Sequence, residues 1–252
     1  MKDQTALAYI NMFAVLGTLE NLCELDEKAK AIIADSKPVS IGFSVKDGPK
    51  GVLSFENGKC KMLHDETKCD IKLPFSSPTK FNKMIDGTAT PIPVKGFTKV
   101  GFLLHEFIML TDRLTELMRP SPEALEDLKF KELSTTLMCY CVASAVSEVG
   151  NHDFIGKFSA RNTSDGDIGF EVAGGPSITV SVKNHKLETI KSKCEKPSAV
   201  LEFGSMEIAR NIFDNAENAM ACVCEGKISV TGMIGNIDNI NRILDRVSYY
   251  LA

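Results

Sequence analysis

The feature that most constrains this chain is a nine-residue string that occurs twice. Residues 41–49 read IGFSVKDGP and residues 168–176 read IGFEVAGGP, which gives six identities at an offset of 127 positions. Solenoid units recur every 20–50 residues. An offset this long therefore indicates a duplicated domain and not an array of short repeats.

The correspondence continues beyond the two strings at the same offset. Residues 53–59 (LSFENGK) match residues 180–186 (VSVKNHK), and both alternate apolar and polar positions as half-buried strands do. Asn57-Gly58 predicts a two-residue hairpin turn, and Asn184-His185 stands where the second half needs the same turn.

With a slip of one or two residues, a further strand and helix repeat. Residues 71–75 (IKLPF) resemble residues 199–203 (AVLEF), and each run leads to a serine, Ser77 or Ser205. Serine is a favoured N-cap residue, so we predict a short helix after each.

The ends of the two halves are also similar. Residues 95–101 (KGFTKVG) are paired with residues 225–232 (EGKISVTG) as a short strand closed by glycine, so that Gly96 matches Gly226. Each half then ends in a helix that contains Asp-Arg, at Asp112-Arg113 and Asp245-Arg246.

Each half begins with a long helix of apolar periodicity, predicted over residues 3–25 and 122–149. Ser121-Pro122 is an N-cap followed by Pro at the first helical position, so the joint falls there. We predict two domains, residues 1–120 and 121–252.

The order of elements in each half is helix, four strands, helix, variable segment, strand, helix. A run of strands beside helices predicts an α+β fold, here a mostly antiparallel five-stranded sheet with helices packed on one face. The variable segment differs between the halves. Residues 88–94 (TATPIPV) contain two prolines, which exclude a regular helix, whereas residues 216–224 are compatible with one.

Composition narrows the function classes. Apolar residues make up 44% and charged residues 25%, which is typical of globular domains, and the net charge of −4 argues against a nucleic-acid binder. We find no apolar run of about 18 residues and no signal-peptide core, so we expect no stable membrane insertion, a cytoplasmic location and reduced cysteines.

Three strings resemble the sterol carrier protein 2 (SCP2) domain, a family of lipid-binding proteins. They are residues 45–49 with the later 57–59, residues 84–87 (MIDG), and residues 225–233 (EGKISVTGM), of which the last is the most similar. The resemblance covers most of both halves. It implies a five-stranded sheet whose helices enclose an apolar tunnel for a sterol, fatty acid, fatty acyl-CoA or phospholipid, without catalytic residues or cofactors.

We therefore expect non-enzymatic binding of a hydrophobic ligand, with lipid transport as a further option. The side chains expected to line the apolar interior are Phe43, Phe55, Phe75, Phe81, Ile85, Phe97, Phe102 and Phe107 in the first half, and Phe170, Val182, Phe203, Phe213, Ile228, Met233 and Ile237 in the second. Residues 102–110 hold more apolar side chains than one helical stripe needs. Either the two halves pack on each other there, or this helix walls a lipid cavity.

Other chemistry is weakly indicated. Cys139 and Cys141 lie two residues apart on a predicted helix and diverge, whereas Cys222 and Cys224 would share a face only on a strand, so no metal is expected. His105 begins a zinc-protease-like string but has no second ligand. Two alternatives remain: an interaction module with closed pockets, and an enzyme whose Cys and His partners meet only in the folded chain.

Overall fold

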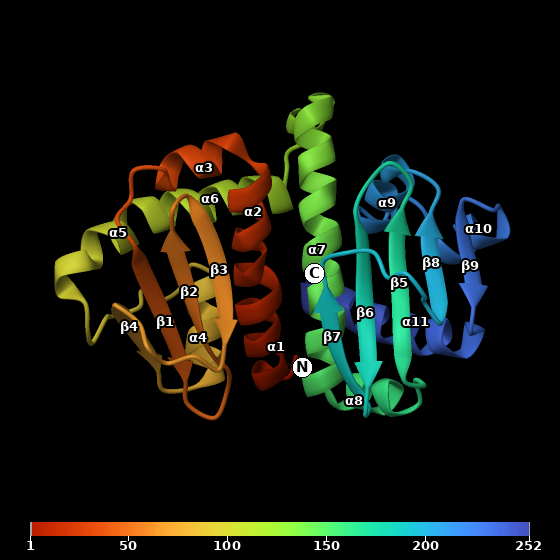
Figure 1. Cartoon of the computed structure of the whole chain (residues 1–252), viewed down its shortest axis with the longest axis horizontal. Helices are drawn as coiled ribbons and strands as arrows, with labels where there is room; N and C mark the ends of the chain where they lie inside the picture. Colours follow the sequence, from red (N-terminus) through yellow and green to blue (C-terminus); the bar gives the residue numbers. More distant parts are fainter. Residues whose placement is uncertain (1, 252) are drawn as a thin grey trace. The chain divides into compact units, whose positions relative to one another are not determined.

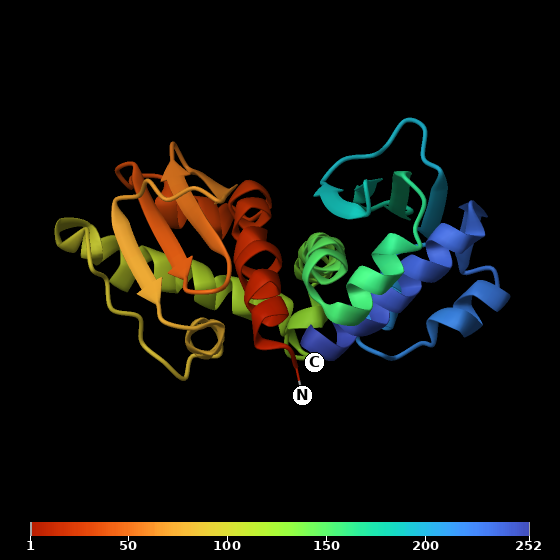
Figure 2. The ribbon, with the colours of Figure 1, turned by 90° about the horizontal axis from the view of Figure 1, so that it is seen from below.

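The computed structural model describes residues 2–251. The chain divides into two compact units, residues 1–133 and 134–252. Each unit contains one β-sheet, and its last helix crosses behind that sheet in the view of Figure 1. Figure 2 shows each unit from below, with the strands above the last helix.

The first unit opens with a helical segment that changes its winding along its length. It consists of α1 (Gln4–Tyr9), the π-helical turn η1 (Ile10–Val15), the 3-10 turn η2 (Leu16–Thr18) and α2 (Leu19–Leu25). The helix predicted over residues 3–25 is therefore present, with an irregular middle. The remaining elements of this unit are α3 (Glu27–Ile33), β1 (Val39–Val45), β2 (Lys50–Glu56), β3 (Lys59–His64), β4 (Ile71–Phe75), α4 (Pro78–Ile85), η3 (Phe97–Lys99), α5 (Val100–Leu104), α6 (Glu106–Met118) and η4 (Ala124–Glu126).

The long helix before the second sheet, α7 (Leu128–His152), begins later than predicted. The Asp127 carboxylate accepts hydrogen bonds from the N–H groups of Lys129 and Phe130 at 2.9 and 3.3 Å. The Ser121 hydroxyl accepts from the Ala124 N–H, ahead of the short turn η4. The predicted start at Pro122 is wrong because the aspartate six residues after Ser121 supplies the cap. The elements that follow are α8 (Phe154–Arg161), β5 (Gly166–Val172), β6 (Ser177–Lys183), β7 (Lys186–Ile190), β8 (Ala199–Phe203), α9 (Met206–Phe213), α10 (Ala219–Cys224), β9 (Ile228–Gly232) and α11 (Ile234–Leu251).

The two sheets have the same strand order and the same register. The first is β3-β2-β1-β4 and the second is β7-β6-β5-β8-β9. The central strand pairs antiparallel with its hairpin partner and parallel with the strand on its other side, β1 with β4 and β5 with β8. Ile41 lies opposite Leu53 and Ile71, as Ile168 lies opposite Val180 and Ala199. Both sheets are thus mixed, which corrects the mostly antiparallel sheets predicted from the sequence.

Both predicted hairpin turns adopt the left-handed backbone that they require. Asn57 and Gly58 have φ of 52° and 72°, and Asn184 and His185 have φ of 51° and 62°. His185 takes this conformation although its Cβ makes it less favourable there than glycine.

The first sheet has four strands and not the five predicted. In the second unit, Glu202 of β8 lies opposite Ser229 of β9. The hydrogen bond from the Gly204 N–H to the Lys227 carbonyl, two residues further along this ladder, makes the 202–229 position a hydrogen-bonded pair, because such pairs alternate.

The first unit has a proline at each of these two positions, Pro74 and Pro93. Neither has an N–H to donate. Pairing beside β4 is therefore reduced to one bridge between Lys72 and Lys95. Ile92, which corresponds to the buried Ile228 of β9, is 78% exposed.

Gly96 corresponds to Gly232, and the predicted match of Gly96 with Gly226 is out of register. Gly96 and Gly232 have φ of 90° and 83°. A Cβ on either would collide with a backbone carbonyl oxygen, that of Asp70 or of Ser198. The shift arises because the second unit inserts α10 ahead of its last strand, as its sequence allowed.

The predicted serine caps are confirmed. Ser77 accepts a hydrogen bond from the Lys80 N–H at 3.3 Å, and Ser205 accepts one from the Ile208 N–H at 3.2 Å. Both serines have nearly the same extended backbone, with φ of −163°.

In each unit a buried aspartate at the corner between the first two helices binds an arginine of the last helix. Arg113 Nε donates to Asp26 Oδ2 at 2.8 Å, and Arg246 Nη2 donates to Asp153 Oδ2 at 2.9 Å. Tyr250 adds a hydroxyl donor to Asp153 at 2.8 Å. Each aspartate also caps the helix that follows it, α3 or α8.

These contacts decide the charge of both aspartates. Burial alone would raise their pKa values, but the hydrogen bonds and positive charge of Arg113 and Arg246 outweigh burial and lower them. Both carboxylates are therefore ionised at neutral pH, and their ion pairs join the corner between the first two helices to the last helix of the unit.

We expect Asp153→Ala to lower the free energy of unfolding by about 3 kcal/mol, because it leaves the Arg246 guanidinium without its partner in a largely buried place. Asp26→Ala should have a similar effect in the first unit. Chemical denaturation at neutral pH measures both. The control is Asp238→Ala, which removes an exposed pair with Arg242 and should change stability by about 0.5 kcal/mol or less. Equal effects of Asp153→Ala and Asp238→Ala would contradict this assignment.

Candidate functional site

Most of the residues expected to line an apolar interior lie inside the units. In the first unit Phe43, Phe55, Phe75, Phe81 and Phe107 are buried and Ile85 and Phe102 are half-buried. In the second unit Phe170, Val182, Ile228 and Ile237 are buried and Phe203 and Phe213 are half-buried. Two expected residues lie on the surface instead, Phe97 at 71% and Met233 at 49% exposure.

The interior of the first unit is filled by aromatic rings that touch one another. Phe81 of α4 lies 6.1 Å from Phe43 and 5.2 Å from Phe75, both in edge-on contact. Phe107 of α6 lies 6.4 Å from both Phe43 and Phe55. Such ring pairs add stability beyond their burial. We call these five side chains the ring cluster; they occupy the space between the sheet and its helices.

The second unit carries smaller side chains at three of the five positions. Phe55 is matched by Val182 at the same point of the strand register. Phe81, the fourth residue after the capping serine, is matched by Ala209. Phe107, six residues before the arginine of the ion pair, is matched by Ile240. The second interior is thus lined by aliphatic side chains where the first holds rings.

The apolar face of α9 extends further than that of α4, because Ile208 is half-buried where α4 has the exposed Lys80. Ile212 and Phe213 of α9 are half-buried, as are Met84 and Ile85 of α4. Ala209 and Ile240 were not among the expected lining residues. They can be identified from the sequence only after the two units are aligned, because they are then seen to replace Phe81 and Phe107 by smaller side chains.

Each unit joins its first long helix to the helix after its fourth strand through a buried polar contact. In the first unit, Asn11 donates to the Asn82 side chain at 3.1 Å, and Asn82 donates to the Gln4 carbonyl at 2.9 Å. In the second, Arg210 donates to Ser134 at 2.8 Å and is paired with Asp214 at 2.6 Å. None of these residues was among those expected from the sequence, although the spacing of Arg210 and Asp214 is that of a helical ion pair.

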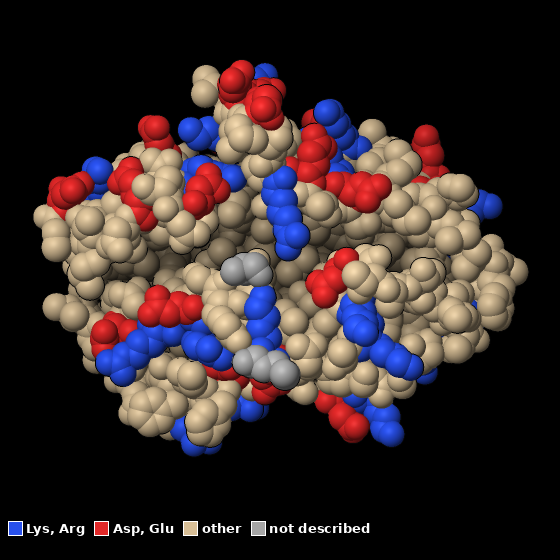
Figure 3. All heavy atoms as spheres, turned by 180° about the vertical axis from the view of Figure 1, so that it is seen from behind, with Lys and Arg blue, Asp and Glu red and all other residues tan. Residues whose placement is uncertain are grey.

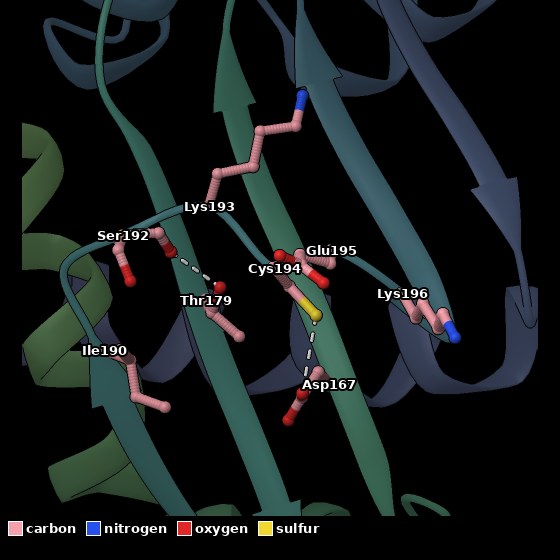
Figure 4. Close-up of a pocket in the computed structure, with 8 residues that line it drawn as sticks. All are labelled: Asp167, Thr179, Ile190, Ser192, Lys193, Cys194, Glu195 and Lys196. Atoms are coloured by element: carbon pink, nitrogen blue, oxygen red, sulfur yellow. Dashed lines mark hydrogen bonds between the residues drawn. The ribbon is translucent and has the colours of Figure 1, made fainter.

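A pocket of about 420 Å³ lies on the outer face of the second sheet, away from the helices (Figure 4). A loop after β7 arches over it, held by a hydrogen bond from the Thr179 hydroxyl to the Ser192 carbonyl at 2.7 Å and by an ion pair of Lys193 with Glu171 at 2.6 Å. Its lining is mainly polar and charged: Asp167, Thr179, Ile190, Ser192, Lys193, Cys194, Glu195 and Lys196. This chemistry does not suit an acyl chain or a sterol.

Cys194 lies in that pocket with its thiol 3.4 Å from Asp167 Oδ2. Burial and the neighbouring carboxylate raise the pKa of the thiol, so it stays protonated and is a poor nucleophile at neutral pH.

Glu148 and His152 form a second titratable pair, one turn apart near the end of α7. Glu148 Oε2 lies 3.5 Å from His152 Nε2. Burial raises the pKa of Glu148 to about 8, and burial together with Lys157 and Lys186 lowers the pKa of His152 to about 4. Both side chains are therefore neutral at pH 7.

Glu217 fastens the start of α10 to the last strand. Its carboxylate accepts from the Asn211 amide at 2.9 Å, the Cys222 thiol at 3.1 Å and Lys227 at 3.0 Å. These donors lower its pKa to about 2.

The two cysteine pairs are not arranged to share a metal. Cys222 and Cys224 lie on the helix α10, one buried and one exposed, and Cys139 and Cys141 are both buried on α7. Within residues 2–251, no group of three or more His, Cys, Asp or Glu is placed to hold a metal ion.

Two helical segments are long and apolar enough to cross a membrane by length and composition, contrary to our reading of the sequence. They are Gln4–Leu25 and Leu128–His152, and 78% and 67% of their most apolar windows are buried in the structure. Core helices of soluble proteins pass the same test, so this is weak evidence for a span.

No family model and no curated protein matches the chain. Among solved structures, it is similar to a sterol carrier protein domain 2 of Helicoverpa armigera, with 17% identity, 44% of this chain and 87% of that chain covered, and a TM-score of 0.36. It is also similar to the apo form of sterol carrier protein 2 from Yarrowia lipolytica, with 18% identity, coverage of 45% and 92%, and a TM-score of 0.35. The likeness is to a sterol-carrier-like fold over less than half of the chain, and it identifies no ligand or site.

We expect Phe81→Ala to lower the free energy of unfolding by about 3–5 kcal/mol, because it removes a fully buried ring from the centre of the ring cluster. The control, Phe97→Ala, removes an exposed ring and should cost about 0.5 kcal/mol or less. Denaturation curves of the two variants test this. Similar losses would contradict a packed ring cluster.

The Glu148 pair predicts a pH dependence of stability. The pKa of Glu148 in the folded protein lies above its usual 4.5. The stability that the protonated Glu148 contributes is therefore fully present below pH 4.5 and is lost as the pH rises to about 8. His152 acts in the opposite sense, between about 6.5 and 4.

Between pH 6.5 and 8, Glu148 changes its charge and His152 does not. The free energy of unfolding should therefore fall by about 1–2 kcal/mol over this range. Glu148→Gln should abolish this fall, whereas Glu132→Gln, an exposed position on the same helix, should leave it. Denaturation midpoints across this range measure the slope, and parallel curves for wild type and Glu148→Gln would count against the prediction.

Proposed function

We propose that the chain consists of two copies of one sterol-carrier-like module, that the second binds a hydrophobic ligand in its interior, and that the first is closed. The ligand class is a fatty acid, fatty acyl-CoA, phospholipid or sterol. The binding is non-enzymatic and cytoplasmic, with lipid transfer as its most direct use.

Three local similarities support a common origin of the two units. The strand registers coincide around Ile41 and Ile168. The strand after the hairpin leads to an equivalent serine cap in each unit. The same aspartate–arginine pair joins the helix corner to the last helix. The aspartate–arginine pairs link residues 87 and 93 positions apart in sequence, and separate origins would have to reproduce these pairs together with the registers and the caps.

The observation that carries the ligand assignment is the replacement of rings by smaller side chains. Val182, Ala209 and Ile240 stand where the first unit has Phe55, Phe81 and Phe107. We infer that these smaller side chains let the second interior admit a guest, which gains about 25 cal/mol per Å² of apolar surface removed from water. Ile208 of α9, which stands where α4 has the exposed Lys80, gives such a guest an apolar way in from the surface.

The first unit favours the alternative function, an accessory module without a ligand. In its ring cluster the ring of Phe81 lies 6.1 Å from that of Phe43 and 5.2 Å from that of Phe75, centre to centre. A close-packed interior of this kind leaves no space for an acyl chain. We therefore assign it a supporting role.

Titration of the delipidated full chain with a fluorescent fatty acid tests the proposal, and we expect a micromolar or lower Kd. Ala209→Phe and, separately, Val182→Phe install the side chains of the first unit in the second. Each should weaken binding by about tenfold or more by filling the interior. The control, Ala173→Phe, places a ring on an exposed turn and should bind as wild type. Absence of binding, or unchanged binding in both interior variants, would contradict the proposal.

A further inference from the structure

The short helix α8 of the second unit exposes two phenylalanines. Phe154 is 86% and Phe158 is 62% exposed, and they lie one turn apart on the same face. Ile155 is exposed beside them. The packing of α8 uses its opposite side, where Gly156, Ser159 and Ala160 are buried.

The equivalent helix of the first unit, α3, does without these apolar side chains. It follows the capping Asp26 as α8 follows Asp153. It has Glu27 and Ala31 at the positions of Phe154 and Phe158. In the first unit this helix therefore forms without phenylalanines on its outer face. We infer that the packing of α8 does not need Phe154 and Phe158 either.

The surroundings of α8 are positively charged, although the whole chain has a net charge of −4. Lys157 and Arg161 lie on the helix itself and are exposed. Lys186, the first residue of β7 after the turn from β6, is close enough to act with Lys157 on the pKa of His152 at the end of α7. Lys183 lies at the other end of that turn and is exposed.

Two of the acidic groups nearby accept hydrogen bonds within the protein. Asp153 is buried in its pair with Arg246, and Asp165 accepts a hydrogen bond from the Asn184 N–H at 3.0 Å. The lower edge of the second unit in Figure 3 shows uncharged atoms beside Lys and Arg side chains.

From this combination we infer that α8 docks the second unit reversibly on an anionic lipid surface. Phenyl rings enter the boundary between headgroups and acyl chains, and lysine and arginine side chains remain at the anionic headgroups. Two phenylalanines and a few cations give peripheral attachment and not insertion. The inference does not require a ligand inside the second unit, so it can fail or succeed independently of the proposed function.

Sedimentation of the full chain with vesicles tests this inference. We expect binding to phosphatidylcholine vesicles that contain phosphatidylserine, little binding to phosphatidylcholine alone, and a loss of binding as salt is raised. The double variant Phe154→Glu, Phe158→Ala gives α8 the residues of α3. It should bind about tenfold or more weakly, since both rings are lost, and keep the wild-type melting temperature because both positions are exposed.

The matched control is Phe97→Ala, which removes a similarly exposed ring from the first unit and should bind as wild type. The inference is overturned if the wild-type chain does not sediment with anionic vesicles. Unchanged binding by the double variant would overturn it as well, as would equal binding to vesicles without phosphatidylserine. A double variant with a lowered melting temperature would show that the rings are structural, which also contradicts the inference.

Discussion

Each unit depends on the ion pair between the aspartate after its first long helix and an arginine of its last helix. Asp26–Arg113 and Asp153–Arg246 each join the two ends of a unit, and each aspartate also starts the helix that follows it. A buried carboxylate is tolerated only when it is paired and hydrogen-bonded. The last helix is thereby fixed across the sheet, and its position decides which side chains face the interior.

The two interiors differ, although the strand registers and the aspartate–arginine pair are alike in both units. The first is packed by the ring cluster and lacks a fifth strand, because Pro74 and Pro93 have no N–H to pair. The second keeps that strand and α10, and it has Ala209 where the first has Phe81. Exchange of a ring for a methyl group reduces the volume of the side chain between sheet and helix, while the register of β1 with β2 and of β5 with β6 stays the same. Ligand binding and structural support can therefore be divided between units of the same framework.

The sequence predicted features that depend on a few neighbouring residues. Asn57-Gly58 and Ser77 determine a turn and a cap locally, and both are as predicted. The start of α7 was misplaced because Ser121 and Asp127 are both good caps. The missing strand requires Pro74 and Pro93 to lie opposite each other, and this is known only after the register of Gly96 is fixed. For the same reason the surface positions of Phe97 and Met233 were not foreseen from their apolar character.

We propose that the second unit alone holds a hydrophobic ligand in its interior. Native mass spectrometry of the freshly purified full chain tests this most directly, because it counts bound molecules without a labelled probe. We expect one co-purifying amphiphile per chain, which organic extraction releases. Two amphiphiles per chain would contradict a closed first unit. A chain that carries none and takes up none when offered fatty acid would contradict binding in the second.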